Sequence, residues 1–444
     1  MKTLVIIDSD ALTRAVFAQC MAGAGWRVLE ADNGEAGVEL AIEHAPAAVL
    51  CDVRTPRRNG FKVCRLIREQ PFLKSTRVIL TSVSQFLNDR ETAFAAGADD
   101  FLVKPIVPAE LAGILATCGL DEAPAAPDPA PARRGAIEPT LVRFWGVRGS
   151  IPSPGPGTAG VGGNTSCVEV RAAGQIIVFD AGSGIRQLGR ALLEEFAERQ
   201  LTITMLVTHT HWDHIQGFPF FMPAYSACAH VRILGYEGAV HGLRSALFEQ
   251  MQSAFFPVGL NQMASHVTFE ELHDMEFAIG PVKVRAIFAN HPGICLAYRL
   301  STPTGDLVFM PDHEAYERQE IERQRATGQQ GNSHQVEHAR LQDEKTVEFL
   351  RGADLVIADG QYTSSEYRER RGWGHSCADD TAALAARAGV RRLALFHHDP
   401  DHDDDMVQAM ERHAQRIAAE KGSPLVVTAA REGAEIVLTP LAGQ

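Results

Sequence analysis

Four potential metal ligands stand close together after the apolar run LTITMLV: His209, His211, Asp213 and His214. The run is typical of a buried β-strand. Alternate residues of an extended chain point to the same side, so His209 and His211 can bind one ion together, while Asp213 and His214 can turn toward a second. A histidine of a protein core normally occurs singly. The spacing therefore predicts a metal centre at the end of this strand.

Two neighbouring metal ions would favour one kind of chemistry. Divalent ions held about 3.5–4 Å apart lower the pKa of a shared water and clamp the oxygens of a substrate, which suits attack of a bridging hydroxide on a phosphodiester. Histidine and aspartate ligands serve zinc, manganese and iron alike, so the sequence leaves the choice among these metals open.

The HxHxDH pattern resembles the signature of the metallo-β-lactamase superfamily, and the resemblance extends over residues 141 to about 440. It implies an αββα sandwich. Further ligands would follow in the segments FANHPG, LVFMPD and LALFHHDP. The resemblance implies that one ion is bound by His209, His211 and His291, that the other is bound by Asp213, His214 and His397, and that Asp312 bridges both. His398 is the alternative to its neighbour, but the register of the LALF strand favours His397.

A further histidine narrows the resemblance. The segment GWGHSC contains His375 and resembles a motif of the branch that includes ribonuclease Z and cyclic-nucleotide phosphodiesterases. This implies that His375 lies near the scissile phosphate, where it stabilises the transition state or protonates the leaving oxygen. Asp213 is the other residue that we expect to act in catalysis.

The predicted hydrolase begins with a glycine-rich segment, FWGVRGSIPSPGPGTAGVGGNTSC. Seven glycines and three prolines from Gly146 to Gly163 predict a loop that can approach a ligand closely. Arg148 and Asn164 in this segment either contact the substrate or stabilise its turns. Asp180, in VFDAGSG, is expected to hold the histidine loop in place rather than to bind metal.

The N-terminal part has its own set of polar residues that follow apolar runs. These runs alternate with helix-like stretches, which predicts a parallel α/β sheet whose strand ends open onto one crevice. The polar residues are Asp8, Asp10, Asp52, Thr81 and Lys104. This pattern resembles the receiver domain of two-component response regulators over residues 1 to about 120.

The receiver resemblance implies a phosphorylation site with Asp52 as the phosphoacceptor. Asp8 and Asp10 would hold Mg²⁺, Thr81 would donate a hydrogen bond to a phosphoryl oxygen, and Lys104 would pair with its charge. The resemblance also implies a cis bond before Pro105.

Ser9 departs from the receiver pattern, because the family usually has two adjacent acids after the first strand. Ser9 stands where a metal-binding acid is expected. Two readings therefore stay open: a receiver that is phosphorylated, and a pseudo-receiver that serves only for dimerisation.

The length of 444 residues requires more than one domain. In residues 121–137, Ala and Pro fill ten of seventeen positions, which predicts a semi-extended linker. We therefore expect a doubly wound (βα)5 receiver at 1–120 and a metallo-β-lactamase-fold phosphodiesterase at 138–444. The polar segment 313–350 is predicted to be helical and exposed, with breaks at its glycines Gly328 and Gly331, either as a solvated excursion or as a lid or dimerisation arm near the active site.

Charge and composition exclude several protein classes. The formal net charge of −13 argues against a broad electrostatic contact with nucleic acid. No segment has the length of a membrane span or the form of a signal peptide, and the eight cysteines form no CxxC pair. We expect a cytoplasmic protein with reduced thiols that does not bind membranes.

These observations support one leading function. We expect a response regulator whose output domain is a dinuclear phosphodiesterase acting on a small cyclic nucleotide or a related diester. Its partners would be a sensor histidine kinase or phosphotransfer protein and a second copy of the chain. The alternatives are an RNA endonuclease of ribonuclease Z type and a metal-binding signalling scaffold without turnover.

Overall fold

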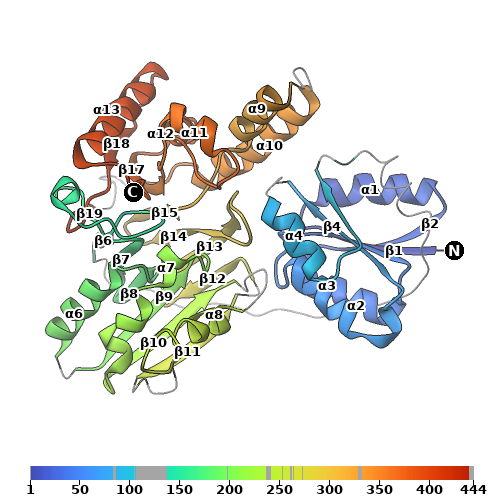
Figure 1. Ribbon diagram of the computed structural model, residues 1–444, viewed down its shortest axis with the longest axis horizontal. Helices are drawn as coiled ribbons and strands as arrows, with labels where there is room; N and C mark the ends of the chain where they lie inside the picture. Colours follow the sequence, from blue (N-terminus) through green and yellow to red (C-terminus); the bar gives the residue numbers. More distant parts are fainter. Residues whose placement is uncertain are drawn as a thin grey trace. The chain divides into compact units, whose positions relative to one another are not determined.

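The computed structural model describes residues 2–83, 87–104, 106, 138–197, 199–236, 242–252, 254–260, 263, 265–272, 274–328 and 333–439. The described residues form two compact units, one at residues 2–106 and the other at 138–439, and each unit is described by itself (Figure 1). The predicted linker at 121–137 and the bond before Pro105 lie outside the described residues.

The first unit is a parallel α/β sheet, as the sequence predicts. Its strand order is β2-β1-β3-β4-β5, and every pairing is parallel. The strands are β1 (Lys2–Ile7), β2 (Trp26–Ala31), β3 (Ala48–Asp52), β4 (Arg77–Ser82) and β5 (Asp100–Val103). The connecting helices are α1 (Ala11–Gly23), α2 (Gly34–His44), α3 (Gly60–Glu69) and α4 (Leu87–Ala95).

The strand order of this unit reverses direction between β1 and β3. In a doubly wound sheet the functional crevice lies at the carboxyl ends of the strands beside such a reversal. Asp8 directly follows β1 and Asp52 is the last residue of β3, so the topology brings these two acids to the same crevice.

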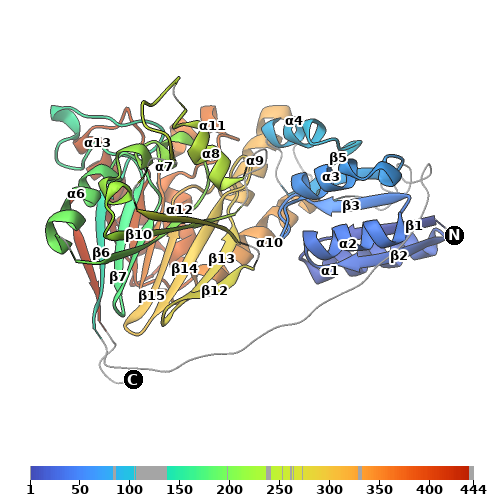
Figure 2. The same ribbon diagram turned by 90° about the horizontal axis from the view of Figure 1, so that it is seen from below.

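The second unit is a sandwich of two mixed sheets, each with seven strands (Figure 2). The first sheet contains, in spatial order, β11 (His266–Glu271), β10 (Ala229–Gly235), β9 (Leu201–Val207), β8 (Gln175–Phe179), β7 (Cys167–Ala172), β6 (Thr140–Gly146) and β19 (Glu435–Leu438). The second contains β12 (Glu276–Ile279), β13 (Val282–Phe288), β14 (Leu296–Thr302), β15 (Gly305–Met310), β16 (Leu355–Asp359), β17 (Arg392–Phe396) and β18 (Val426–Ala429).

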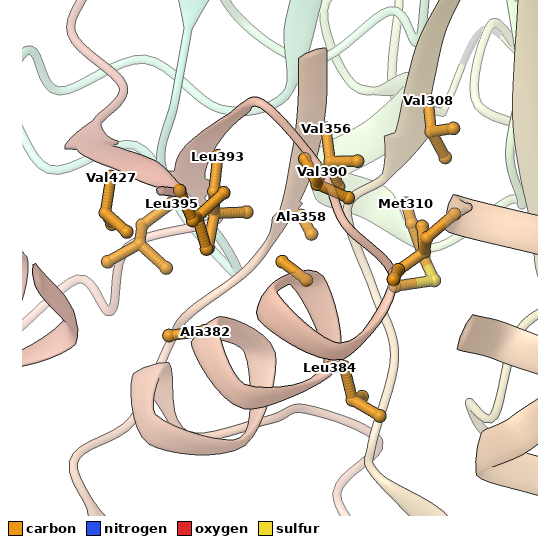
Figure 3. Packing of buried hydrophobic residues seen from close by; sticks show 14 of the residues in the cluster. Val308, Met310, Val356, Ala358, Ala382, Leu384, Val390, Leu393, Leu395 and Val427 are labelled. Carbon is orange, nitrogen blue, oxygen red and sulfur yellow. The ribbon is translucent and has the colours of Figure 1, made fainter. Parts of the chain in front are cut away.

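Helices cover the outer faces of the sandwich. The first sheet packs on α6 (Ile185–Phe196) and α8 (Leu243–Glu249), and the short helix α7 (Trp212–Ile215) follows β9. The second sheet packs on α10 (Ser333–Leu350), α12 (Ala378–Arg387) and α13 (Asp404–Glu420), whereas α9 (Tyr316–Thr327) contacts α10 and α11 (Ser364–Arg370) lies between β16 and α12 in the chain. Figure 3 shows the apolar contact on this side, where Ala382 and Leu384 of α12 lie beneath Leu393 and Leu395 of β17.

Aromatic side chains fill the space between the two sheets. Phe179 of β8 stacks on Phe309 of β15 with their ring centroids 4.5 Å apart, and Phe309 meets Phe396 of β17 edge to face at 5.5 Å. All three rings are fully buried. The observed order of layers, helix–sheet–sheet–helix, confirms the predicted αββα sandwich.

The polar segment 313–350 is helical, as predicted, but it is not an exposed excursion. Helix α9 ends at Gly328, whose φ of +68° suits glycine, and Gly331 lies outside the described residues. The apolar residues at the end of α10, including Val347 and Leu350, are buried in the core of the second sheet. Asp343 of α10 accepts hydrogen bonds from the backbone nitrogens of the first turn of α9, so the two helices pack together.

Candidate metal centre

The predicted ligands come together at one end of the sandwich, from both sheets. His209 and His211 follow β9, and Asp213 and His214 lie in α7. On the second sheet, His291 follows β13, Asp312 follows β15, and His397 follows β17. Each sheet therefore contributes part of the set, and the packing of the sheets fixes the distances between the parts.

The first group contains His209, His211 and His291, whose ligand atoms lie within 4.8 Å of one another. The Nε2 atom of His291 is 3.0 Å from Nδ1 of His211. His209 and His291 are buried, whereas His211 is exposed. The centre is therefore open to solvent at His211.

The second group contains Asp213, His214 and His397, again within 4.8 Å. Oδ2 of Asp213 is 3.0 Å from Nε2 of His397 and 3.3 Å from Nε2 of His214. All three residues are buried.

Asp312 faces both groups with different oxygens. Its Oδ2 is 3.6 Å from Nε2 of His209 and 3.5 Å from Nε2 of His291. Its Oδ1 is 3.2 Å from Nε2 of His214 and 3.4 Å from Nε2 of His397. One carboxylate oxygen for each group is the arrangement that a bridging ligand requires.

The unpaired atoms of the centre fit metal ions. Nε2 of His209 and Oδ1 of Asp312 are buried without a hydrogen-bond partner among the described residues. Buried polar atoms normally have partners, and atoms left free for a metal ion are an exception. The residues present thus fit the divalent ions that this donor set prefers.

Burial and charge set the protonation of the ligands differently. Burial holds the pKa of His209 and of His291 well below the usual range of histidine, so both rings are neutral. Burial raises the pKa of Asp312, but the neighbouring rings of His214 and His397 outweigh it and hold the pKa well below the usual range of aspartate. Neutral imidazoles and ionised carboxylates are the metal-binding forms.

His214 differs from these ligands in its protonation. Burial lowers the pKa of His214, but Asp312, Asp213 and Asp180 outweigh it and raise this pKa well above the usual range of histidine. An ion bound there would therefore displace a proton.

Contacts behind the ligands fix their orientation. Nδ1 of His214 donates to Oδ2 of Asp180 at 2.7 Å, which is the supporting role predicted for Asp180. Nδ1 of His397 donates to the side-chain oxygen of Gln361 at 2.9 Å, and Nδ1 of His291 donates to the carbonyl of Gly374 at 2.9 Å. These contacts place the proton on Nδ1 and leave Nε2 to face the centre.

The backbone is strained beside the centre. Ser150, Asp180 and His397 have φ values of +62°, +57° and +58°, a region that residues other than glycine rarely adopt. The backbone nitrogen of Ser150 donates to Oδ2 of Asp213 at 2.7 Å. Strained residues persist where the surrounding contacts hold them and are concentrated at functional sites.

His375 lies beside the two groups, and its main partner is a residue that sequence reasoning missed. Its Nδ1 atom is 2.8 Å from Oδ2 of Asp359, the last residue of β16. Its ring lies against those of His291 and His397, at centroid distances of 5.0 and 4.7 Å. Burial lowers the pKa of His375, but Asp359 and Asp312 outweigh it and raise the pKa to about 9.

Asp359 and Gln361 had a visible but unused signal in the sequence. Asp359 directly follows the apolar run LVIA and Gln361 comes two residues later, just as Asp180 follows QIIVF and Asp312 closely follows DLVFM. Asp359 also accepts hydrogen bonds from the backbone nitrogens of His313 and Gln361, so it connects three segments beside the centre.

The contacts of Arg148 favour the turn-stabilising role, one of the two roles that the sequence left open. Arg148 is fully buried, and its guanidinium donates to the backbone carbonyls of Gly162, Asp399 and His402. Asn164 likewise stabilises its turn, because its side-chain nitrogen donates to Glu432 at 2.9 Å. His398 is also structural, since its Nε2 lies 3.1 Å from the carbonyl of Ala430.

The receiver pocket is assembled at the crevice of the first unit. Lys104 bonds to Asp8 at 2.5 Å and also to Asp52, and Thr81 pairs with Asp52 across neighbouring strands. Asp10, the other acid that the sequence predicts to hold Mg²⁺, caps α1, because its Oδ1 accepts from the backbone nitrogens of Leu12 and Thr13. A carboxylate at a helix N-terminus satisfies otherwise unpaired backbone groups.

Comparison with known families decides the identity of both units. Residues 4–116 match the family described as response regulator receiver domain, and residues 175–328 match the β-lactamase superfamily domain. The chain joins a receiver domain to a metallo-β-lactamase hydrolase. The second match includes six of the expected ligands, whereas His375 and His397 lie beyond it.

Individual relatives agree with this division. Ribonuclease Z of Thermoplasma acidophilum is 26% identical over 290 residues, which are 60% of this chain and 88% of that protein. The transcriptional regulatory protein SrrA of Staphylococcus aureus is 31% identical over 108 residues, and the match spans only 44% of its length and 24% of this chain. The crystal structure of the metallo-β-lactamase fold protein YhfI from Bacillus subtilis is 18% identical, with a TM-score of 0.45, and the match covers 67% of this chain and 99% of YhfI.

The two families imply cofactors and a partner in general terms. The metallo-β-lactamase fold implies divalent metal ions, and a receiver domain usually binds Mg²⁺ and takes a phosphoryl group from a donor such as a sensor histidine kinase. Among the described residues, no helix has the length and apolar character needed to span a membrane.

Proposed function

We propose that the C-terminal unit is a dinuclear phosphodiesterase that hydrolyses a small phosphodiester such as a cyclic nucleotide. One ion would be bound by His209, His211, His291 and Asp312, and the other by Asp213, His214, Asp312 and His397. The observation that carries the proposal is His375, which lies next to the complete ligand set and whose Nδ1 is bonded to Asp359. Divalent ions bound there would activate water and clamp phosphoryl oxygens.

The residues around the ions have separate tasks in this proposal. Asp213 is held by the backbone of Ser150 and by His397, so its orientation is fixed before substrate binds. Because Nδ1 of His375 is bonded to Asp359, Nε2 is the atom that can reach the substrate. A protonated ring there would donate its proton to the leaving oxygen of the diester.

The test compares leaving groups. The full chain, loaded with zinc or manganese, is assayed with two substrates. In a cyclic mononucleotide the leaving group is a ribose alkoxide, which needs a proton, whereas the p-nitrophenolate that leaves bis(p-nitrophenyl) phosphate needs little protonation. His375→Ala should lower kcat for the cyclic nucleotide by about 10²–10⁴ and have a much smaller effect on the second substrate. His230→Ala, a partly exposed histidine of β10, is the matched control. A metal-loaded protein that hydrolyses neither substrate would contradict the proposal and would favour the alternative of a metal-binding signalling scaffold without turnover.

A specific observation favours a second candidate, an RNA endonuclease. The similarity to ribonuclease Z covers 88% of the length of that relative. Against it stands the net charge of −13, which weakens binding to a polyanion. Structured RNA is therefore the third substrate of the same assay, and cleavage of RNA faster than of cyclic nucleotides would favour the second candidate.

We further propose that the receiver, at residues 1–120, controls the hydrolase at 138–444 through the linker at 121–137. Phosphorylation of Asp52 would disturb its contact with Lys104 and change either dimerisation or access to the metal centre. The test measures kcat/KM and sedimentation with and without beryllofluoride, using Asp52→Asn as the variant that cannot respond. Unchanged values together with no binding of beryllofluoride would support the pseudo-receiver reading.

A further inference from the structure

Two of the four tryptophans have unusually large exposed fractions. Trp26 is 8% exposed, and the indole nitrogen of Trp145 donates to Glu169 at 2.9 Å. Trp212 and Trp373, in contrast, are 72% and 59% exposed. Large apolar side chains that stay in water cost free energy, so exposed aromatic rings that gather in one place mark binding sites.

Both exposed tryptophans belong to segments that form the metal centre. Trp212 lies between His211 and Asp213 at the start of α7. Trp373 directly precedes Gly374, whose carbonyl accepts from Nδ1 of His291.

A chain of short contacts connects the two tryptophan-bearing segments. The other nitrogen of the His291 ring lies 3.0 Å from His211, which is the exposed member of its group. Trp212 is thus next in the chain to His211, and Trp373 is next to the residue that holds the ring of His291, the partner of His211 in this contact.

A third loop that touches the ligand set also carries an exposed apolar side chain. Ile151 is 59% exposed and follows Ser150, whose backbone nitrogen donates to Asp213 at 2.7 Å. The loop approaches the ligands so closely that a Cβ added at Gly149 would lie 2.2 Å from the ring of His397. Three separate loops that touch the ligand set thus each expose a large apolar side chain.

We infer that Trp212 and Trp373 form an aromatic subsite that binds a planar ring of the substrate beside the scissile phosphodiester, with Ile151 adding apolar contact. This inference rests on the proposed phosphodiesterase function and specifies its substrate class: diesters that carry a nucleobase. An indole offers a rigid, flat surface that stacks on any base, and the subsite would therefore accept purines and pyrimidines alike.

A base-stacking subsite fits the charge of the protein. Recognition of a polyanion depends mainly on many cationic contacts. A chain with a net charge of −13 has no overall positive charge that would favour them. Stacking is independent of backbone charge and is worth about 1–3 kcal/mol per base, which corresponds to about 5- to 150-fold in affinity. Two indoles can thus select a mononucleotide without a basic groove.

The experiment measures binding of products, so that it does not depend on turnover. The metal-loaded full chain is titrated in a calorimeter with adenosine 5′-monophosphate, uridine 5′-monophosphate and ribose 5-phosphate. Both nucleotides should bind about 5- to 150-fold more tightly than the sugar phosphate. Trp212→Ala and Trp373→Ala should each weaken binding of the nucleotides and leave the affinity for ribose 5-phosphate unchanged.

Matched variants at the same positions separate stacking from general apolar contact. Trp212→Phe and Trp373→Phe keep a flat ring and should retain most of the preference for nucleotides. The variants Trp212→Leu and Trp373→Leu keep apolar area without a ring and should lose the preference for nucleotides. Equal affinity of the wild type for nucleotides and ribose 5-phosphate would overturn the inference. It would also be overturned if the alanine variants lowered the affinity for all three ligands by the same factor.

The outcomes distinguish this inference from the proposed function. A preference for nucleotides without hydrolysis of any diester would support the aromatic subsite and contradict the phosphodiesterase. Hydrolysis of cyclic nucleotides without a preference for the base would support the phosphodiesterase and contradict the subsite.

Discussion

The variant Asp180→Asn tests the proposed metal site of Asp213, His214 and His397, because Asp180 holds the ring of His214 in place. Asp180 is fully buried, and its Oδ1 accepts from the backbone nitrogen and the hydroxyl of Thr208 at 2.8 and 2.9 Å. Its Oδ2 accepts from Nδ1 of His214 at 2.7 Å and from the hydroxyl of Ser166 at 2.8 Å. Nδ1 therefore keeps its proton, and Nε2, which faces Asp213 and Asp312, is the atom that can bind an ion.

Asparagine keeps the size of this side chain but replaces one acceptor by a donor. With its oxygen toward Thr208, the new amide nitrogen faces Nδ1 of His214, which must then accept and carry its proton on Nε2. A protonated Nε2 cannot bind metal. Loss of such a supporting contact typically lowers metal affinity about 10- to 100-fold, which corresponds to roughly 1.4–2.7 kcal/mol.

The assay is a competition titration of zinc with a chromogenic chelator. The wild type should bind two equivalents, whereas Asp180→Asn should retain the ion at His209, His211 and His291 and bind the other about 10- to 100-fold more weakly. Ser166→Ala is the matched control, because it removes a partner of the same oxygen but leaves the contact with His214 intact. Two equivalents bound by Asp180→Asn with unchanged affinity would refute the assignment of Nε2 of His214 as a ligand.

Three further predictions follow from single contacts. Asp312→Ala removes the oxygen that faces each histidine group, so mass spectrometry should find less than one tightly bound metal ion per chain; two retained ions would exclude the bridging role. Phe179→Ala deletes a fully buried ring between the sheets and should lower the free energy of unfolding in denaturant by about 3–5 kcal/mol, whereas the half-exposed Val437→Ala should change it by less than about 0.5 kcal/mol. Burial raises the pKa of Asp343 to about 7, so its contribution to stability is full below about pH 4 and is lost as the pH rises toward 7. Asp343→Asn should flatten this decline in urea unfolding between about pH 4 and 7, whereas Glu344→Gln should not. Identical slopes for the wild type and Asp343→Asn would contradict the origin of the decline in Asp343.

The sequence predicted those parts of the site whose ligands are neighbours in the chain. His209, His211, Asp213 and His214 share one strand end and one turn, so their spacing alone implies a common ion. His291 and the other ligands of the second sheet are far apart in sequence, and only their order within a family resemblance connected them. Their convergence depends on how the two sheets pack, which no local pattern encodes.

Residues that act through burial were harder to predict. Arg148 looks like a substrate contact in a glycine-rich loop, but only the folded loop shows that its guanidinium is enclosed by three backbone carbonyls. Asp10 looks like a metal ligand, yet its position before Leu12 and Thr13 also suits a helix cap. Each side chain has two competing uses: tertiary contacts hold Arg148 in the loop, whereas the contacts of Asp10 are local, within three residues of the chain.

The distribution of ligands explains why the metal centre and the core of the sandwich should respond together. The first sheet supplies four of the seven ligands and the second sheet supplies His291, Asp312 and His397. The ring of Phe179 on one sheet packs on Phe309, three residues before Asp312 on the other. A small shift between the sheets would therefore separate Asp312 from His209 and His214, and because interiors are close-packed such a shift needs rearrangement of these rings. Metal binding should stabilise the native sandwich, since a ligand that binds only the folded state adds its free energy of binding to that of folding.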